Sequence, residues 1–204
     1  MPPSGQPPGL TSLSNMNIAQ PAQAVRAFPE GAPLSFLQKL FPDKKQRAAL
    51  APLYAAIVAE GRDSSWYREG GVPDTIDGRF DMVAAVTALV LLRLEAEGEA
   101  GRGPSILLTE TFIDDMDGIL RQIGIGDYVV GKHVGRMMAA LGGRLAAFRE
   151  ARESRSFAAA ARRNIFHEAP PSEAALASVA TRLECLAEGL DAASLEGLIG
   201  GSLA

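Results

Sequence analysis

The sequence predicts an all-α fold, a single compact domain of about six to seven helices that follows an N-terminal tail. Two observations carry this prediction. Apolar residues make up 47% of the chain, and alanine, leucine and glycine are plentiful, a profile that favours helices. Apolar side chains also recur at three- and four-residue steps, whereas no segment shows the reliable alternation of a strand. With 204 residues the chain is long enough to bury a full core.

The segment 71–97 is predicted to form the central helix of this domain. Gly71 and Pro73 punctuate the chain, and Asp74 or Thr75 can then cap the helix. Asp77 and, more weakly, Asp81 favour the positive end of its dipole. Two apolar rows lie on neighbouring faces: Ile76, Phe80, Val83, Thr87, Val90 and Leu94, and Met82, Val86 and Leu89. A helix that is apolar on two sides is expected to be surrounded by others.

Other helices are expected on either side of it. Residues 43–60 form one, which Pro52 kinks or starts. A loop at 101–104 precedes a helix from about 105 to 123. The next starts near 130 and is expected to end or leave the core near residue 151. Residues 152–171 are basic and then loop-like. Ser172 opens a last helix over 172–190, which carries Leu176, Val179, Leu183, Leu186 and Leu190 on one face.

The N-terminal residues 1–33 hold seven of the thirteen prolines and almost no charge, so we predict a disordered tail, with the helical domain over 34–204. Residues 34–41 are expected to form a short amphipathic helix. That helix is either a lid on the core or a contact with a membrane surface or partner, since lysines and an arginine follow it.

The sequence also indicates the cellular compartment in which the protein is expected. No secretory signal is seen, and the longest apolar run is too short to cross a bilayer. The single cysteine, Cys185, excludes an internal disulfide, fits a reducing compartment and is expected to be a small buried residue. We therefore expect a soluble cytoplasmic protein, with a peripheral position at the cytoplasmic face of the inner membrane as the other option.

Charged residues are distributed unevenly along the chain. Acidic residues dominate 95–117 and basic residues dominate 127–163, which fits solvated faces, internal pairing or an anionic partner. Asp115 falls beside the buried stripe of its helix and needs a cation, for which Arg79, Lys132 and Arg136 are candidates. The alternatives are a client-facing polar site and an internal polar network that fixes helix register. The network would comprise Asp74, Asp77, Asp81 and Asp115.

No motif for catalysis or cofactor binding is supported. Residues 126–132 have the spacing of a phosphate-binding loop, but His133 stands where a serine or threonine should follow, and a helix precedes the motif. The carboxylates lack the Glu-x-x-His pairs of a di-metal bundle, and His133 and His167 are isolated. We therefore expect a binding protein with no enzymatic activity, no cofactor, no metal and no DNA partner.

Several segments resemble the ubiquinol–cytochrome c chaperone family. They are GVPDTIDGRFD at 71–81, FIDDMD at 112–117 with LR at 120–121, GIGD at 124–127, VGK at 130–132 and GR at 143–144. They occur in the family's order and cover about half the chain, residues 50–149, so the tail and the last helix lie outside the resemblance.

The resemblance implies an assembly factor of ubiquinol–cytochrome c reductase (complex III). Such proteins bind newly made cytochrome b and act with a small partner protein. The tail lacks an arginine-rich amphipathic transit peptide, which points to a bacterial member. Residues proposed to contact the client or partner are Trp66, Tyr67, Arg79, Lys132, Arg136 and Arg144.

Two alternatives from other classes remain. One is a peripheral membrane or scaffold protein that places residues 34–47 and 144–163 on anionic lipid and has no cytochrome b client. The other is an enzyme on a helical bundle, which stoichiometric metal in the purified protein would favour.

Overall fold

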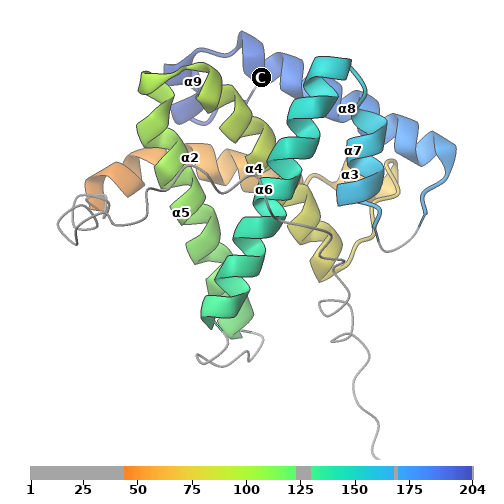
Figure 1. Ribbon diagram of the computed structural model, residues 1–204, viewed down its shortest axis with the longest axis horizontal. Coiled ribbons are helices and arrows are strands. Elements are labelled where there is room, and N and C mark those ends of the chain that lie inside the picture. The colour runs from red at the N-terminus through yellow and green to blue at the C-terminus, as the bar shows by residue number, and fades with distance from the viewer. Residues whose placement is uncertain (1–43, 123–129, 168–169, 204) are drawn as a thin grey trace, which may run out of the picture.

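The computed structural model describes residues 44–122, 130–167 and 170–203, and all regular structure in these ranges is helical (Figure 1). The predicted all-α class is confirmed. The helices are α2 (Lys44–Gly61), α3 (Ser64–Arg68), α4 (Ile76–Ala96), α5 (Glu99–Gln122), α6 (Val130–Ser154), α7 (Phe157–Asn164), α8 (Glu173–Ala192) and α9 (Leu195–Ile199). The predicted tail over 1–33 and the amphipathic helix over 34–41 lie outside the described residues.

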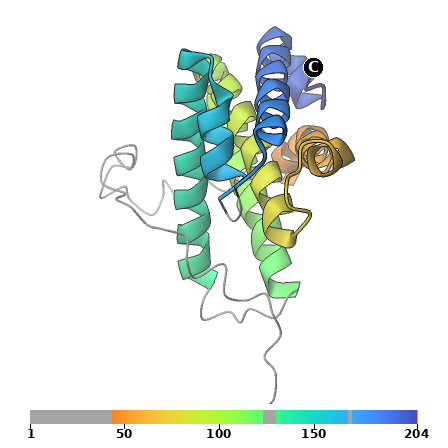
Figure 2. The same cartoon turned by 90° about the vertical axis from the view of Figure 1, so that its right-hand side faces the viewer.

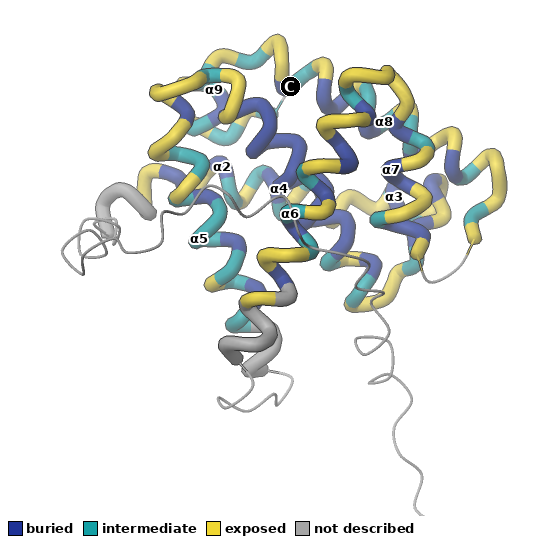
Figure 3. The backbone as a smooth tube through the Cα atoms, in the orientation of Figure 1, coloured by how far each residue is buried: buried dark blue, intermediate teal, exposed yellow. Residues whose placement is uncertain are grey.

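Helix α4 lies at the centre of the domain, as predicted. Helices α2, α5, α6 and α8 all pack against it, and Figures 1 and 2 show them around it. Every residue from 81 to 94 is buried, so α4 is covered on all sides over four turns. Figure 3 shows this contrast with the exposed outer helices. Ile76 departs from the prediction, because its side chain is 66% exposed on the first turn, before the neighbouring helices close around α4.

The start of α4 explains the glycine-rich segment that precedes it. Thr75 caps the helix, because its hydroxyl accepts a hydrogen bond of 3.0 Å from the Gly78 amide. A Cβ atom on Gly78 would lie 2.0 Å from the carbonyl oxygen of Pro73, so only glycine fits there. Gly71 adopts a φ of +65°, which also favours glycine. The segment 71–81 thus fixes the geometry of a helix start.

Helix α5 begins earlier than predicted, because residues 101–104 belong to the helix rather than to a loop. Gly101 sits against the end of α4, where a Cβ atom would lie 1.8 Å from the carbonyl oxygen of Leu94. This glycine permits close helix packing and does not interrupt the helix. Pro104 lies inside α5 near its start, where few helical hydrogen bonds are lost.

The C-terminal part contains two helices that the sequence analysis missed. Helix α7 lies in the basic segment before Pro170 and Pro171, where no helix was predicted, and α9 follows the predicted last helix. The core face of α7 has only Phe157, Ala160 and Ala161, and alanine gives a weak apolar signal. Helix α8 is confirmed with its Ser172 cap, whose hydroxyl accepts a hydrogen bond of 3.1 Å from the Ala175 amide.

Two further predictions in this region can be compared with the structure. The fourth helix was expected to end or leave the core near residue 151: α6 continues to Ser154, but Ala151 is its last buried residue. Arg152 does not turn into the core. Its guanidinium reaches both carboxylate oxygens of Asp191 on α8, at 2.6 and 2.7 Å. Cys185, expected to be buried, is exposed, since it lies on the outer side of α8.

A buried arginine joins α4 to the end of α8. Arg93 donates hydrogen bonds of 2.9 Å to the carbonyl oxygens of Leu190 and Ala193, and it pairs with Glu97 at 2.5 Å. Its cation therefore satisfies carbonyl groups that a helix leaves open at its C-terminus. This contact holds the C-terminal helices against the central one.

Candidate functional site

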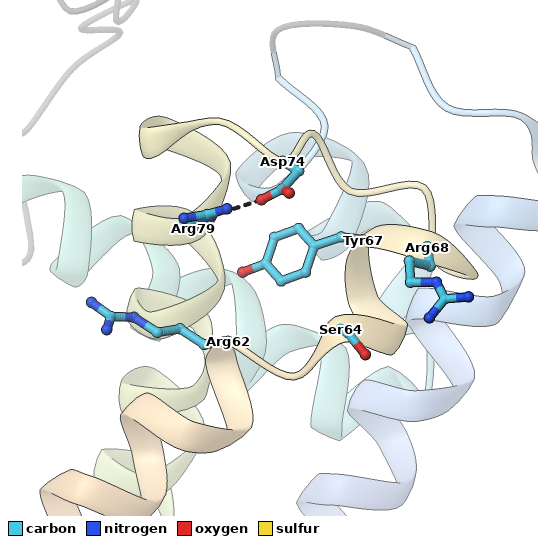
Figure 4. Close-up of a pocket in the computed structure, with 6 residues that line it drawn as sticks. All are labelled: Arg62, Ser64, Tyr67, Arg68, Asp74 and Arg79. Atoms are coloured by element: carbon cyan, nitrogen blue, oxygen red, sulfur yellow. Dashed lines mark hydrogen bonds and ion pairs between the residues drawn. The ribbon is translucent and has the colours of Figure 1, made fainter.

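A surface pocket of about 500 Å³ lies where α2 ends, α3 runs and α4 begins (Figure 4). Its lining is mainly basic and aromatic: Arg62, Ser64, Tyr67, Arg68, Asp74 and Arg79. Three of these residues, Tyr67, Asp74 and Arg79, are among the predicted site residues. Arg62 follows α2 directly, and Arg68 is the last residue of α3.

The short helix α3 is held rigidly against the domain by Trp66. The Trp66 side chain is 1% exposed, and its indole Nε1 donates a hydrogen bond of 2.9 Å to the carbonyl oxygen of Glu60. The Arg182 guanidinium covers the ring, 4.0 Å from its centroid. Asp63 also caps α3 by accepting a hydrogen bond of 3.0 Å from the Ser65 amide, so the start of the helix is fixed as well.

Tyr67 forms a wall of the pocket. Its hydroxyl donates a hydrogen bond of 2.7 Å to the carbonyl oxygen of Gly61, which fixes the ring. Partial burial raises the pKa of Tyr67 above its usual value, so the phenol is neutral at physiological pH. The ring supplies an apolar surface between charged groups.

The pocket carries more positive than negative charge. Arg79 donates a hydrogen bond of 2.7 Å from Nε to Asp74, which lowers the pKa of Asp74 and raises the pKa of Arg79. Arg62 and Arg68 are exposed, and their side chains make no hydrogen bond or ion pair within the described part of the chain. The lining thus contains three guanidinium groups and one carboxylate.

A second polar cluster is buried between α4, α6 and α7. Asp81 on α4 accepts a hydrogen bond from Arg144 on α6, and its other oxygen lies 2.7 Å from His167 Nε2. Arg144 also donates hydrogen bonds of 3.3 Å to the carbonyl oxygens of Ala140 and Asn164. Burial lowers the pKa of Arg144, but a guanidinium stays charged in proteins. This cluster joins the three helices.

The structure separates the residues predicted to contact a client. Tyr67 and Arg79 lie at the pocket, whereas Trp66 and Arg144 are buried and present no polar group to a client in this structure. The side chains of Lys132 and Arg136 lie outside the described part of the structure.

The carboxylates of the predicted polar network also separate. Asp74 is exposed at the pocket, Asp77 is half-buried in the first turn of α4, and Asp81 is buried against Arg144. Asp115 accepts a hydrogen bond of 2.8 Å from the Tyr54 hydroxyl on α2. Of its three predicted cation partners, Arg79 pairs with Asp74 instead.

The pairing of Tyr54 with Asp115 predicts a dependence of stability on alkaline pH. Burial, and then the hydrogen bond to Asp115, raise the pKa of Tyr54 far above its usual value. Tyrosine in the unfolded chain ionises near pH 10. The contribution of Tyr54 to the free energy of unfolding is therefore complete below that pH and is lost as the pH rises further. Urea unfolding at pH 8 and at pH 11 should therefore show a smaller loss for Tyr54→Phe than for the unchanged protein. Equal losses would contradict the expectation.

Basic residues in 144–163 are largely paired within the domain. Arg149 pairs with Glu95 at 2.6 Å, Arg152 with Asp191, and Arg162 with Glu173 at 3.1 Å. The pair of Glu95 and Arg149 joins the acidic region 95–117 to the basic region 127–163, so the two regions neutralise each other in part within the domain. Few of these charges are left for a lipid surface.

Comparison with known proteins assigns the family. A family model described as ubiquinol–cytochrome C chaperone matches residues 68–203, two thirds of the chain. The chain belongs to this family. A crystal structure described as the Cbp3 homolog from Brucella abortus is similar, with a TM-score of 0.68 and 28% identity over 82% of this chain and 93% of that one. No curated protein matches the sequence.

The family match differs in extent from the resemblance expected over 50–149. It begins at the last residue of α3 and includes α8 and α9, which the sequence analysis had placed outside. The family match therefore includes α4 to α9 and half of the pocket lining, whereas α2 lies outside it. No helix in the described ranges is both long and apolar enough to cross a membrane, and those ranges contain no cluster of metal ligands.

Four residues of these sites were not predicted from the sequence: Arg62, Ser64 and Arg68 in the pocket, and His167 beside Asp81. Arg62 and Arg68 stand at helix ends, where basic residues are common, and nothing in their spacing relates them to the start of α4. His167 lies 86 residues from Asp81, so no local pattern links the two. The only available signal was that basic residues flank Trp66 and Tyr67 on both sides.

Proposed function

We propose that this chain is an assembly factor of ubiquinol–cytochrome c reductase that binds newly made cytochrome b before the complex is completed. It would act by binding and not by catalysis, without a cofactor, together with a small partner protein. It would work in the cytoplasm or at the cytoplasmic face of the inner membrane. Family membership over residues 68–203 is the observation that carries the proposal.

The geometry supports a binding role for the pocket side of the molecule. The core around α4 is closed, so a client would dock on the surface and not inside the bundle. At the pocket, Tyr67 supplies an apolar wall, and exposed arginines supply charge. A membrane-protein client presents apolar segments with charged loop ends before assembly, and a mixed surface of this kind can hold them reversibly.

Deletion of the gene in its host tests the proposal. We expect a selective loss of spectroscopically detected cytochrome b and of the assembled bc complex, while other membrane haem proteins stay at their normal level. The wild-type gene on a plasmid should restore both. An intact bc complex in the deletion strain would overturn the proposal.

The predicted Lys132 and Arg136 face can be tested in the same strain. If this face contacts the client, the double variant Lys132→Glu with Arg136→Glu should accumulate as a folded protein but restore markedly less cytochrome b than the wild type. The matched control is Arg162→Glu with Arg163→Glu, which makes the same charge change on α7. Unchanged cytochrome b with the first variant would show that the face is merely solvated.

A further inference from the structure

We infer that the pocket between α2, α3 and α4 binds a side-chain carboxylate, an aspartate or glutamate in an extramembrane segment of the client. The inference rests on the proposed function, since it names the chemistry by which that client is held. Its site consists of Arg62 and Arg79 on the side of the Tyr67 hydroxyl, with Arg68 on the other side of the ring.

The balance of charge in the pocket points to an anionic ligand. Arg62 and Arg68 have no side-chain partner within the described residues, and Arg79 shares its charge with Asp74. Guanidinium groups are planar and present paired donors that match a carboxylate. An entering carboxylate on the side of Arg79 would therefore also meet Arg62, a cation that no internal acid neutralises.

The positions of the side chains give the pocket a preformed shape. In Figure 4, the hydroxyl of Tyr67 points to the side where Arg62 and Arg79 lie, and Arg68 lies on the other side of the ring. The hydrogen bond from Tyr67 to Gly61 and the buried Trp66 fix the wall of the pocket before any ligand arrives. A preformed wall reduces the ordering cost of binding.

Asp74 already places a carboxylate against one of the pocket's arginines. Its carboxylate already binds Arg79 at 2.7 Å, and both side chains are more than half exposed, 59% for Asp74 and 57% for Arg79. Exposed ion pairs of this kind contribute little to stability. A client carboxylate can therefore take the place of Asp74 on Arg79 at small cost while it also contacts Arg62.

The surroundings of the pocket favour a peptide over a membrane. Glu69, Asp74 and Asp63 are exposed near it, so a flat anionic surface would meet acids as well as arginines. A single side chain that enters the pocket meets mainly the guanidinium groups. Ile76 is exposed three residues before Arg79 on α4, and residues at this spacing share a helix face. It offers an apolar contact to a residue beside the client's acid.

Peptide binding to the purified full chain tests the inference. The probes are fluorescent overlapping peptides that cover the extramembrane segments of the host's cytochrome b, each acidic peptide paired with a version carrying Asn or Gln in place of Asp or Glu. We expect at least one acidic peptide to bind, and its amide version to bind about tenfold more weakly. Arg62→Glu with Arg79→Glu should weaken the acidic peptide by a similar factor, and Asp74→Asn should strengthen it.

A matched control separates the pocket from general charge. Arg102 is exposed near the start of α5, at the opposite end of α4, and Arg163 is exposed on α7. Arg102→Glu with Arg163→Glu makes the same charge change as the pocket variant and should leave peptide binding unchanged. Equal binding of acidic and amide peptides, or an equal loss with this control, would overturn the inference. A third outcome would also overturn it: the protein binds vesicles of phosphatidylglycerol and cardiolipin through Arg62 and Arg79 but binds no peptide through them. The ligand would then be a lipid phosphate.

The deletion strain distinguishes this inference from the proposed function. If Arg62→Glu with Arg79→Glu fully restores the bc complex although it has lost peptide binding, the carboxylate site is not used for the client and only the inference falls. If deletion itself leaves the bc complex intact, the proposed function falls. Failure of the double variant to restore the complex, with its fold intact by circular dichroism, supports both.

Discussion

Replacing Arg144 with methionine is expected to lower the free energy of unfolding by about 3–5 kcal/mol. The side chains of Arg144 and Asp81 are each 5% exposed, so the substitution would leave Asp81 buried with a charge that His167 alone would have to satisfy. A buried carboxylate without its cation is costly, whereas methionine fills a similar volume and leaves little cavity. Urea unfolding followed by circular dichroism measures the change.

Arg149→Met is the matched control for this prediction. Arg149 lies on the same helix and pairs with Glu95, but both side chains are largely exposed. Loss of an exposed pair should cost less than about 1 kcal/mol. Adding Asp81→Asn to Arg144→Met should recover part of the stability, because it removes the buried charge. If Arg144→Met proves no more destabilising than Arg149→Met, the pair does not hold α4 and α6 together.

Replacing Gly101 with alanine is the second large effect, with an expected loss of about 3 kcal/mol. The new Cβ atom would lie 1.8 Å from the carbonyl oxygen of Leu94, and because that atom is backbone, α5 would have to move away from α4. The displacement would also disturb the packing of the following residues of α5. Thermal and urea unfolding of the variant would measure the loss of stability.

Gly103→Ala makes the same chemical change two residues further along α5. Apart from its chain neighbours and the backbone of its own helix, no atom lies within 4 Å of the position of its Cβ, and alanine favours a helix over glycine. We expect this variant to be more stable than the wild type by about 0.5–1 kcal/mol. If the free energy of unfolding falls for Gly101→Ala and rises for Gly103→Ala, close helix packing requires Gly101. A change of the same sign in both variants would contradict this.

The helices that were predictable from sequence are those with a cap and a long apolar row. Helix α4 has Thr75 and the buried run 81–94, and α8 has Ser172 and five buried apolar residues at regular spacing. Helix α7 was missed because alanine and phenylalanine gave only a weak periodic signal. The start of α5 was misplaced because Gly101 indicates a turn in a sequence, while in the fold it serves helix contact.

The candidate site was only partly predictable for a related reason. Tyr67, Asp74 and Arg79 lie within one short stretch, so the sequence could place them near one another. Arg144 was expected on a client-binding surface, yet its partner Asp81 lies 63 residues away, and only the crossing of α4 and α6 brings the two together. Charge pairing between distant helices depends on packing geometry, which periodicity along one helix does not contain.

The contact between the two ends of the described chain bears on the order of synthesis. Helix α9 packs on α2, Gly201 lies against the backbone of Pro52, and Arg93 binds carbonyl groups at the end of α8. On a translating ribosome, α2 and α4 therefore emerge long before the segments that cover them. The domain can close only after its last helices have been made, so until then the nascent chain carries uncovered apolar surface of the kind that general chaperones recognise.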